Sequence, residues 1–181
     1  FQQHEIQVND SGFDQLLKDL TPVAVLFDRY MIEEQFGWRV EEQLPDAIRI
    51  VDTVDLHSLR LERQRAVRFG ESFSEESLIK SEPAWREVAS MMRCDLSLLI
   101  SDFEYNLVKR VGKFSDEKLF YLPFLLSPDE SKPLTDTPSF AKRSDFVTIG
   151  NFRHPPNRDA VRQLKNEIWP LIRKFLPDAE L

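Results

Sequence analysis

The chain has 181 residues, of which 41% are hydrophobic and 30% are charged, and its formal net charge at pH 7 is -7. This balance is typical of a folded globular protein and excludes a disordered chain. The acidic charge argues against nonspecific nucleic-acid binding, which depends on Lys and Arg. A single cysteine, Cys94, excludes an internal disulfide and favours a reducing compartment, so we predict a cytoplasmic location. No apolar run reaches the ~20 residues that span a bilayer.

Short apolar runs alternate with longer amphipathic segments, a pattern that predicts a mainly parallel α/β sheet with flanking helices. The predicted strands are residues 4–8, 23–27, 47–51, 96–100 and 119–125. The predicted helices are residues 9–20, 33–44, 55–69 and 82–93, and another helix begins after residue 101. Residues 70–80 are polar, and we expect a loop there.

The composition changes after residue 127, where three prolines lie among Ser, Thr, Asp and Lys. We predict a first domain at residues 1–127, a linker at 128–144 and a second βα segment at 145–181. The second segment begins with an expected strand at residues 146–149. One strand and one helix cannot build a core, so we expect this segment to pack on other structure. Docking on a second copy would make a homodimer.

Ligands bind parallel α/β sheets at the carboxyl ends of the strands. This rule selects polar side chains that follow four of the predicted strands. They are Asp28 and Arg29; Asp52, Asp55 and His57; Ser101 and Asp102; and Gly150, Asn151, Arg153 and His154.

The densest of these groups lies between Asp52 and Arg60. Asp55, His57 and Arg60 could together orient a hydroxyl and stabilise a leaving phosphate. A structural alternative is that Asp55 caps the helix and Arg60 pairs with a surface acid. The spacing Asp52-x-x-Asp55 is not the Asp-x-Asp pattern of metal-dependent transferases, so we predict no metal site.

Three further groups keep two interpretations each. Asp28 and Arg29 could form a loop ion pair or contact a ligand. Ser101 and Glu104 have capping-box spacing, which favours a structural role. The turn at residues 150–157 could hold an anion at a helix N-terminus, with Arg153 beside it, or could be a plain loop capped by Asn157. We expect Cys94 to be a buried small residue.

Several segments, in order, resemble the GT-B glycosyltransferases of family 4, the glycosyl transferases group 1. Residues 52–60 resemble the segment of their N-terminal domain that supplies an Asp or His to the interdomain cleft. Residues 86–88 and 93–104 resemble a later stretch of that domain, and residues 120–124 resemble the strand before its linker. Residues 146–152, 155–157 and 168–172 resemble the first strand, turn and helix of their nucleotide-sugar domain.

The resemblance implies a cleft between two Rossmann-like domains, where a sugar passes with retention from a nucleotide sugar to an unknown acceptor. It requires no metal or cofactor beyond that donor, and it allows the full-length protein to associate with a membrane surface. The expected roles are catalytic for His57 and Asp55; substrate-binding for Asp28, Arg29, Arg60, Ser101 and Glu104; and donor-binding for Gly150, Asn151, Phe152, Arg153 and His154.

Two expected motifs of the family are not in this sequence: a Gly-rich loop near the start and a Glu-x7-Glu segment near the donor. The chain also begins with Phe1 and not with Met. We therefore expect a fragment truncated at both ends, and we expect it to be inactive alone. Two alternatives stay open, a receiver-like signalling module with Asp28 and Asp52 at a phosphoacceptor site, and a degenerate transferase that serves protein interaction.

Overall fold

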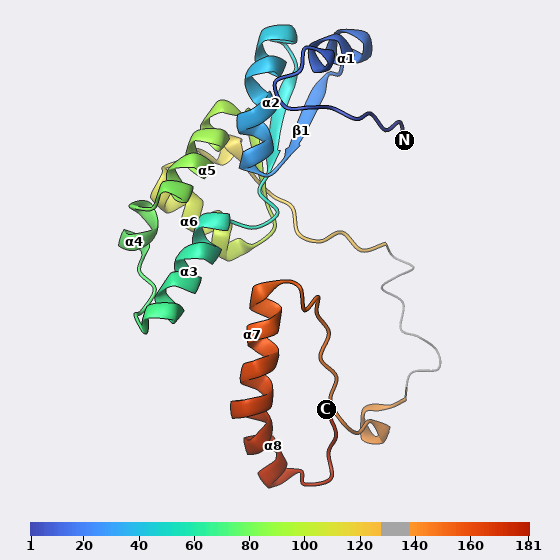
Figure 1. Cartoon of the computed structure of the whole chain (residues 1–181), viewed down its shortest axis with the longest axis vertical. Helices are drawn as coiled ribbons and strands as arrows, with labels where there is room; N and C mark the ends of the chain where they lie inside the picture. Colours follow the sequence, from blue (N-terminus) through green and yellow to red (C-terminus); the bar gives the residue numbers. More distant parts are fainter. Residues whose placement is uncertain (128–137) are drawn as a thin grey trace. The chain divides into compact units, whose positions relative to one another are not determined.

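The computed structural model describes residues 1–127 and 138–181. The chain divides into two compact units, Phe1–Leu126 and Ser127–Leu181 (Figure 1). Most of the predicted linker, residues 128–137, lies outside the described residues, and its last part contains a short 3-10 helix, η2, at Phe140–Lys142.

The first unit contains a parallel sheet of four strands. The strands are β1 Ala24–Asp28, β2 Ile48–Asp52, β3 Leu96–Leu99 and β4 Leu119–Tyr121, and they lie side by side in that order. Every neighbouring pair is parallel. This arrangement confirms the predicted Rossmann-like α/β class.

One helix precedes β1, and the other helices of this unit connect the strands. They are α1 Gly12–Leu20, α2 Tyr30–Gln43, α3 His57–Phe69, α4 Glu75–Ile79, α5 Glu82–Arg93 and α6 Asp102–Gly112, and the 3-10 turn η1 Asp116–Lys118 precedes β4. The strand order advances in one direction, and right-handed crossovers then place the connecting helices on the same face of the sheet.

The core lies between that face and the helices. Phe27, Val51 and Leu99 point into it from the strands, and Val40 and Met91 meet them from α2 and α5. The opposite face carries Leu26, Ile48 and Phe120, each about half exposed at 54%, 51% and 50%. Within the first unit, therefore, only one face of the sheet has a hydrophobic core.

Local sequence explains where several elements begin and end. Ser81 caps α5 by accepting a hydrogen bond from the Ala84 amide (3.4 Å), and Pro83 occupies the first turn, where its missing N–H is harmless. Gly70 ends α3 with a φ of 67°, a conformation that glycine adopts without strain. Helix α2 ends before Leu44, the residue that precedes Pro45 and is disfavoured in a helix for that reason.

Three element predictions are wrong. Residues 4–8 form no strand and are exposed, because no neighbouring strand pairs with them. The predicted loop at 70–80 contains α4, which the Ser74 side chain caps and the buried Leu78 anchors. The predicted strand at 146–149 forms no ladder with another strand. The Phe146 amide donates a backbone hydrogen bond to the Glu180 carbonyl (2.9 Å).

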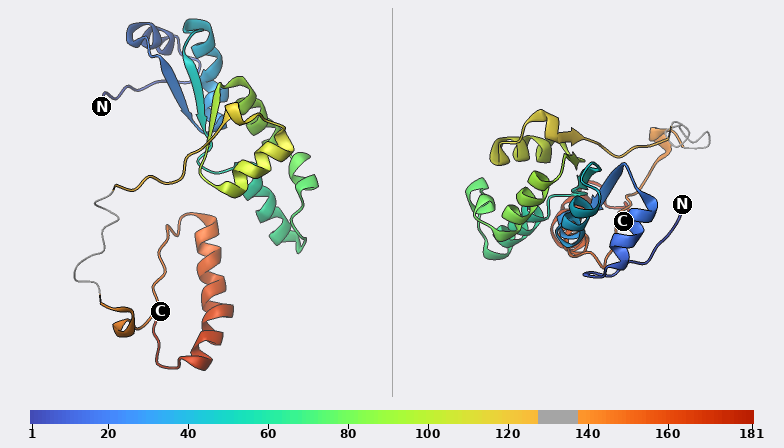
Figure 2. Two further views of the ribbon diagram at one scale, coloured as in Figure 1. Left: turned by 180° about the vertical axis from the view of Figure 1, so that it is seen from behind. Right: turned by 90° about the horizontal axis from the view of Figure 1, so that it is seen from above.

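The second unit is one continuous helix beside an extended segment (Figure 2). The helix consists of α7 Pro155–Gln163, a π-helical turn η3 Leu164–Ile168, and α8 Trp169–Phe175. Pro170 lacks an N–H and crowds the preceding turn, which accounts for the wide turn before it. The Phe146 ring packs edge-on against Trp169 at 5.5 Å.

Candidate functional site

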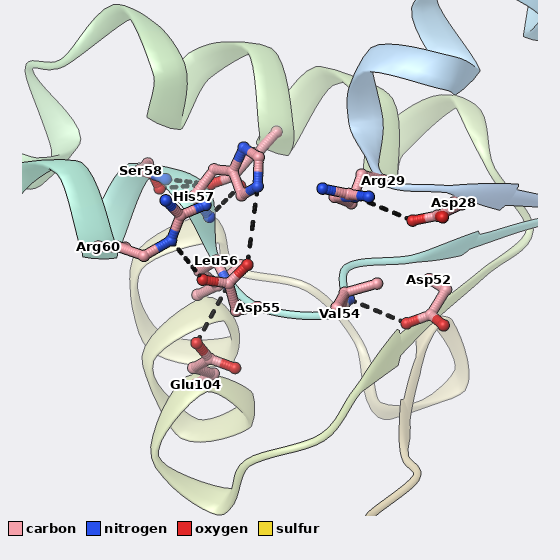
Figure 3. A network of polar contacts seen from close by, with 11 residues as sticks. Asp28, Arg29, Asp52, Val54, Asp55, Leu56, His57, Ser58, Arg60 and Glu104 are labelled. Carbon is pink, nitrogen blue, oxygen red and sulfur yellow. Dashed lines mark hydrogen bonds and ion pairs between the residues drawn. The ribbon is translucent and has the colours of Figure 1, made fainter. Parts of the chain in front are cut away.

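Two residues at the carboxyl ends of β1 and β2 have strained backbones. Arg29 has φ 71° and ψ 158°, a region that is almost exclusive to glycine, and the β-branched Val54 has φ 60°. Asp52 holds both in place. Its carbonyl accepts the Arg29 amide at 2.8 Å, and its Oδ1 accepts the Val54 amide at 2.9 Å, the second bond being drawn in Figure 3. Strain of this kind clusters at functional sites, so this edge is the candidate site.

The loop after β2 brings together the three residues that the sequence grouped there. Arg60 Nε lies 2.7 Å from Asp55 Oδ2, and His57 Nε2 lies 3.7 Å from Asp55 Oδ1 (Figure 3). The first distance is a hydrogen-bonded ion pair, whereas the second is too long for a hydrogen bond. Arg60 thus pairs with Asp55, and Asp55 does not cap the helix.

The His57 ring is mostly buried. Its side chain is 14% exposed, and its edge packs against the Tyr30 ring at a centroid distance of 5.9 Å. Burial lowers the pKa of His57, and the charges of Arg60 and Arg29 lower it further, against the opposing effect of Asp55. At neutral pH the imidazole is therefore uncharged, and it can accept a proton or a hydrogen bond from a hydroxyl.

Buried carboxylates from two other helices hold the start of α3. Glu87 on α5 accepts hydrogen bonds from the His57 amide (2.6 Å), the Ser58 amide (3.1 Å) and the Ser58 hydroxyl. Glu104 on α6 accepts the Leu56 amide at 3.1 Å. Burial raises the pKa of Glu87 and of Glu104, and these hydrogen bonds oppose the rise. The two acids occupy the helix end that an anionic ligand would otherwise favour.

Ser101 and Glu104 form half of the predicted capping box. The Ser101 hydroxyl accepts the Glu104 amide at 3.4 Å, as the spacing predicts. The reciprocal bond is absent from the described contacts, because the Glu104 carboxylate turns to Leu56. Glu104, predicted to bind substrate, is 9% exposed and supports α3 from within.

Asp28 and Arg29 form the loop ion pair that was one of their two interpretations. Arg29 Nε lies 2.9 Å from Asp28 Oδ1, and the side chains are 41% and 63% exposed. Both remain open to solvent at the same strand ends as Asp52, because Asp28 and Asp52 lie opposite each other in the sheet register.

The residues predicted to bind the nucleotide-sugar donor lie in the second unit. They form a turn that is held by hydrogen bonds among its own residues. Asn151 Oδ1 accepts the Arg153 amide at 3.0 Å, and the Asn151 carbonyl accepts the His154 amide at 2.9 Å and Asn157 Nδ2 at 3.3 Å. Asn157 is thus not the N-cap, a position that His154 takes. Gly150 fits closely here, because a Cβ on it would lie 3.3 Å from the Asn157 side chain. Phe152 and Arg153 are exposed.

Sequence reasoning gave no role to Tyr30, Val54 or Glu87. A signal for Glu87 exists, since it is an acid on the same helical face as the apolar Ala84 and Met91. Val54 carries no such signal, because its strain arises from the loop and not from its residue type.

Among residues 1–127 and 138–181, no group of three or more His, Cys, Asp or Glu is placed to hold a metal ion. No helix in the same residues combines the length and apolar character needed to cross a membrane. No family model, curated protein or solved structure matches the chain.

Proposed function

We propose that this chain is part of a glycosyltransferase of the GT-B type, which transfers a sugar from a nucleotide sugar to an acceptor with retention. In this proposal residues 1–127 belong to the acceptor-side domain, and residues 145–181 begin the donor domain. The observation that carries the proposal is His57, a largely buried imidazole with a lowered pKa beside Asp55, at a strained strand edge.

The chemistry of this edge suits a sugar or another polyol. The uncharged His57 ring can accept a hydrogen bond or a proton from a hydroxyl group. Asp55 is held by Arg60, so its carboxylate keeps one orientation and can accept a second hydroxyl. Tyr30 supplies an aromatic wall beside the imidazole. By the family resemblance, this is the place of the transferred sugar, with Arg153 near the donor diphosphate.

The strand order speaks against the receiver-like alternative. Receiver-like domains have the order 2-1-3-4-5, whereas the described strands run β1-β2-β3-β4. Asp52, the proposed phosphoacceptor, is also engaged by the Val54 amide. A degenerate transferase that serves protein interaction keeps the same fold, so only ligand binding separates it from an active enzyme.

The test is a thermal shift of the full-length protein with uridine, guanosine and adenosine types of nucleotide sugar. A ligand at 100 times its Kd adds about 2.7 kcal/mol to the stability of the folded state. We expect one nucleotide class to raise the melting temperature, and we expect residues 1–181 alone to show no turnover. A well-folded full-length protein that responds to none of the three classes would support the degenerate module.

A variant series then ties the activity to the site. His57→Ala should abolish transfer while leaving the thermal shift with the donor nucleotide, because its role is at the transferred sugar. The matched control is His4→Ala, which replaces an exposed histidine outside every helix and strand. Equal activity of both variants would remove His57 from the mechanism.

A further inference from the structure

Glu87 is a buried acid on α5 whose carboxylate contacts the first turn of α3. We propose that Glu87 is a positioning residue, whose carboxylate fixes the first turn of α3 and thereby the place of the His57 ring. The inference depends on the proposed function only in treating the His57 site as catalytic.

The number of donors on this one carboxylate supports the assignment. The Leu56 N-cap has no side-chain oxygen, so the first amides of α3 need acceptors from elsewhere. Glu87 Oε1 takes the His57 amide, and Oε2 takes the amide and hydroxyl of Ser58. A carboxylate can accept on both oxygens, whereas an amide at this position would turn its NH₂ toward one of these N–H groups.

Hydrogen bonds, more than packing, keep the carboxylate in place. A cavity of about 40 Å³ borders Glu87 and Ser58, with Leu56, Met91 and Leu107 in its wall. A second, smaller cavity lies between Glu87 and Tyr30. Because Glu87 lines both cavities, a side chain that loses these hydrogen bonds has room to move, and the first turn of α3 can move with it.

The His57 ring reports such a movement, because its surroundings come from several elements. Arg29 and Tyr30 face it from the start of α2, Asp55 and Arg60 from its own segment, and Glu87 holds its amide from α5. Burial is the largest cause of its lowered pKa. A displaced first turn exposes the ring, and the pKa of His57 then rises toward the ordinary value of about 6.5.

The experiment measures the three histidine ring signals of the 181-residue chain by NMR across a pH titration. We expect Glu87→Gln and Glu87→Asp both to raise the pKa of His57, and both to shift the amide signals of residues 57 and 58. Comparing these two variants separates the effect of the carboxylate's position from the effect of its charge. Loss of the negative charge in Glu87→Gln would by itself lower the pKa of His57, and Glu87→Asp keeps the charge but shortens the reach.

Glu104→Gln is the matched control. Glu104 is also buried and also serves the start of α3, but it accepts one described hydrogen bond, from the Leu56 amide, which an amide oxygen can keep. We expect the pKa of His57 to stay at its unmodified value in this variant.

Two results would overturn the assignment. One is a lowered His57 pKa in Glu87→Gln with no change in Glu87→Asp, which would show an effect of charge alone. The other is unchanged His57 and Ser58 signals in both variants. If the Glu87 variants do not fold, Ser58→Ala removes one of the three donors and leaves the carboxylate, and an unmoved His57 signal there would count equally against the proposal.

The measurement does not depend on transferase activity. A full-length protein that binds no nucleotide sugar would overturn the proposed function and leave the positioning role of Glu87 intact. Conversely, a protein that binds its donor but whose His57 and Ser58 signals are unchanged in the Glu87 variants would overturn only the positioning role.

Discussion

The two units of the chain repeat the same alternation of extended and helical segments, but within residues 1–127 and 138–181 only the first unit has a core. Val40 and Leu99 of the first unit are completely buried. In the second unit no side chain at residue 127 or at 138–181 is buried, and Phe175 is 86% exposed. A βα pattern therefore predicts local structure, whereas a core forms only where several strands lie together.

The first unit also leaves apolar side chains uncovered, on one face of its sheet. Parallel sheets are usually covered on both faces, yet Leu26, Ile48 and Phe120 are about half exposed on one of them. The helix-covered face explains how the unit holds together. The two units thus differ in how far their apolar side chains are buried, and unfolding experiments can measure this difference.

Separating the units gives the largest expected effect. Residues 1–126 should unfold cooperatively in urea, because they keep the whole described core, while residues 138–181 should show no cooperative transition. Circular dichroism against urea concentration makes the measurement, with the 181-residue chain as the control. A cooperative transition of 138–181 at low concentration would contradict the comparison, and light scattering would then show whether self-association, as predicted for this segment, provides the core.

Leucine truncation measures the same difference within the intact chain. Leu99→Ala removes a fully buried side chain from β3 and should cost about 2–5 kcal/mol of unfolding free energy. The matched change Leu171→Ala, at a position 55% exposed in the second unit, should stay within about 0.5 kcal/mol. Urea unfolding gives both values. Similar losses for the two variants would mean that Leu171 is packed in solution.

The sequence predicts the fold of the first unit better than its site. Alternation of apolar runs gave the four strands of the sheet, because buried strands need apolar residues whatever surrounds them. It failed at residues 4–8 and 146–149, where the residues suit a strand but no partner strand is present. Pairing depends on distant residues, which local pattern does not contain.

The same limit applies to the site residues. Asp55, His57 and Arg60 were grouped correctly because they lie within six positions of one another on one loop and helix turn. Glu87 is 30 positions from His57, and only the packing of α5 against α3 brings them together. The strain at Val54 is a further property of the folded loop.

Relief of that strain gives a smaller, stabilising effect. Val54→Asn should raise the unfolding free energy by about 1 kcal/mol, because Asn tolerates a positive φ that a β-branched residue resists. The matched change Val147→Asn replaces a valine that is 84% exposed in the second unit and should alter stability little. Equal gains from both variants, measured by urea unfolding, would mean that the added polar side chain stabilises the protein and that relief of strain does not.

The smallest expected effect is a pH dependence that His57 contributes in the first unit. Burial lowers the pKa of His57 in the folded state, so below about pH 6.5 the unfolded state binds the proton first and stability falls as the pH decreases. Glu87 and Glu104, whose pKa values are raised, act in the opposite direction, from their ordinary range up to their raised folded-state pKa values. The window from pH 7.5 to 6 includes the ordinary pKa of histidine, so a His57 variant measures the His57 effect there. Urea unfolding across that window should show a decline that His57→Gln reduces, whereas His154→Gln, at an exposed position outside the core, should leave it as it is. A decline that survives His57→Gln would mean that another group of the first unit is titrating.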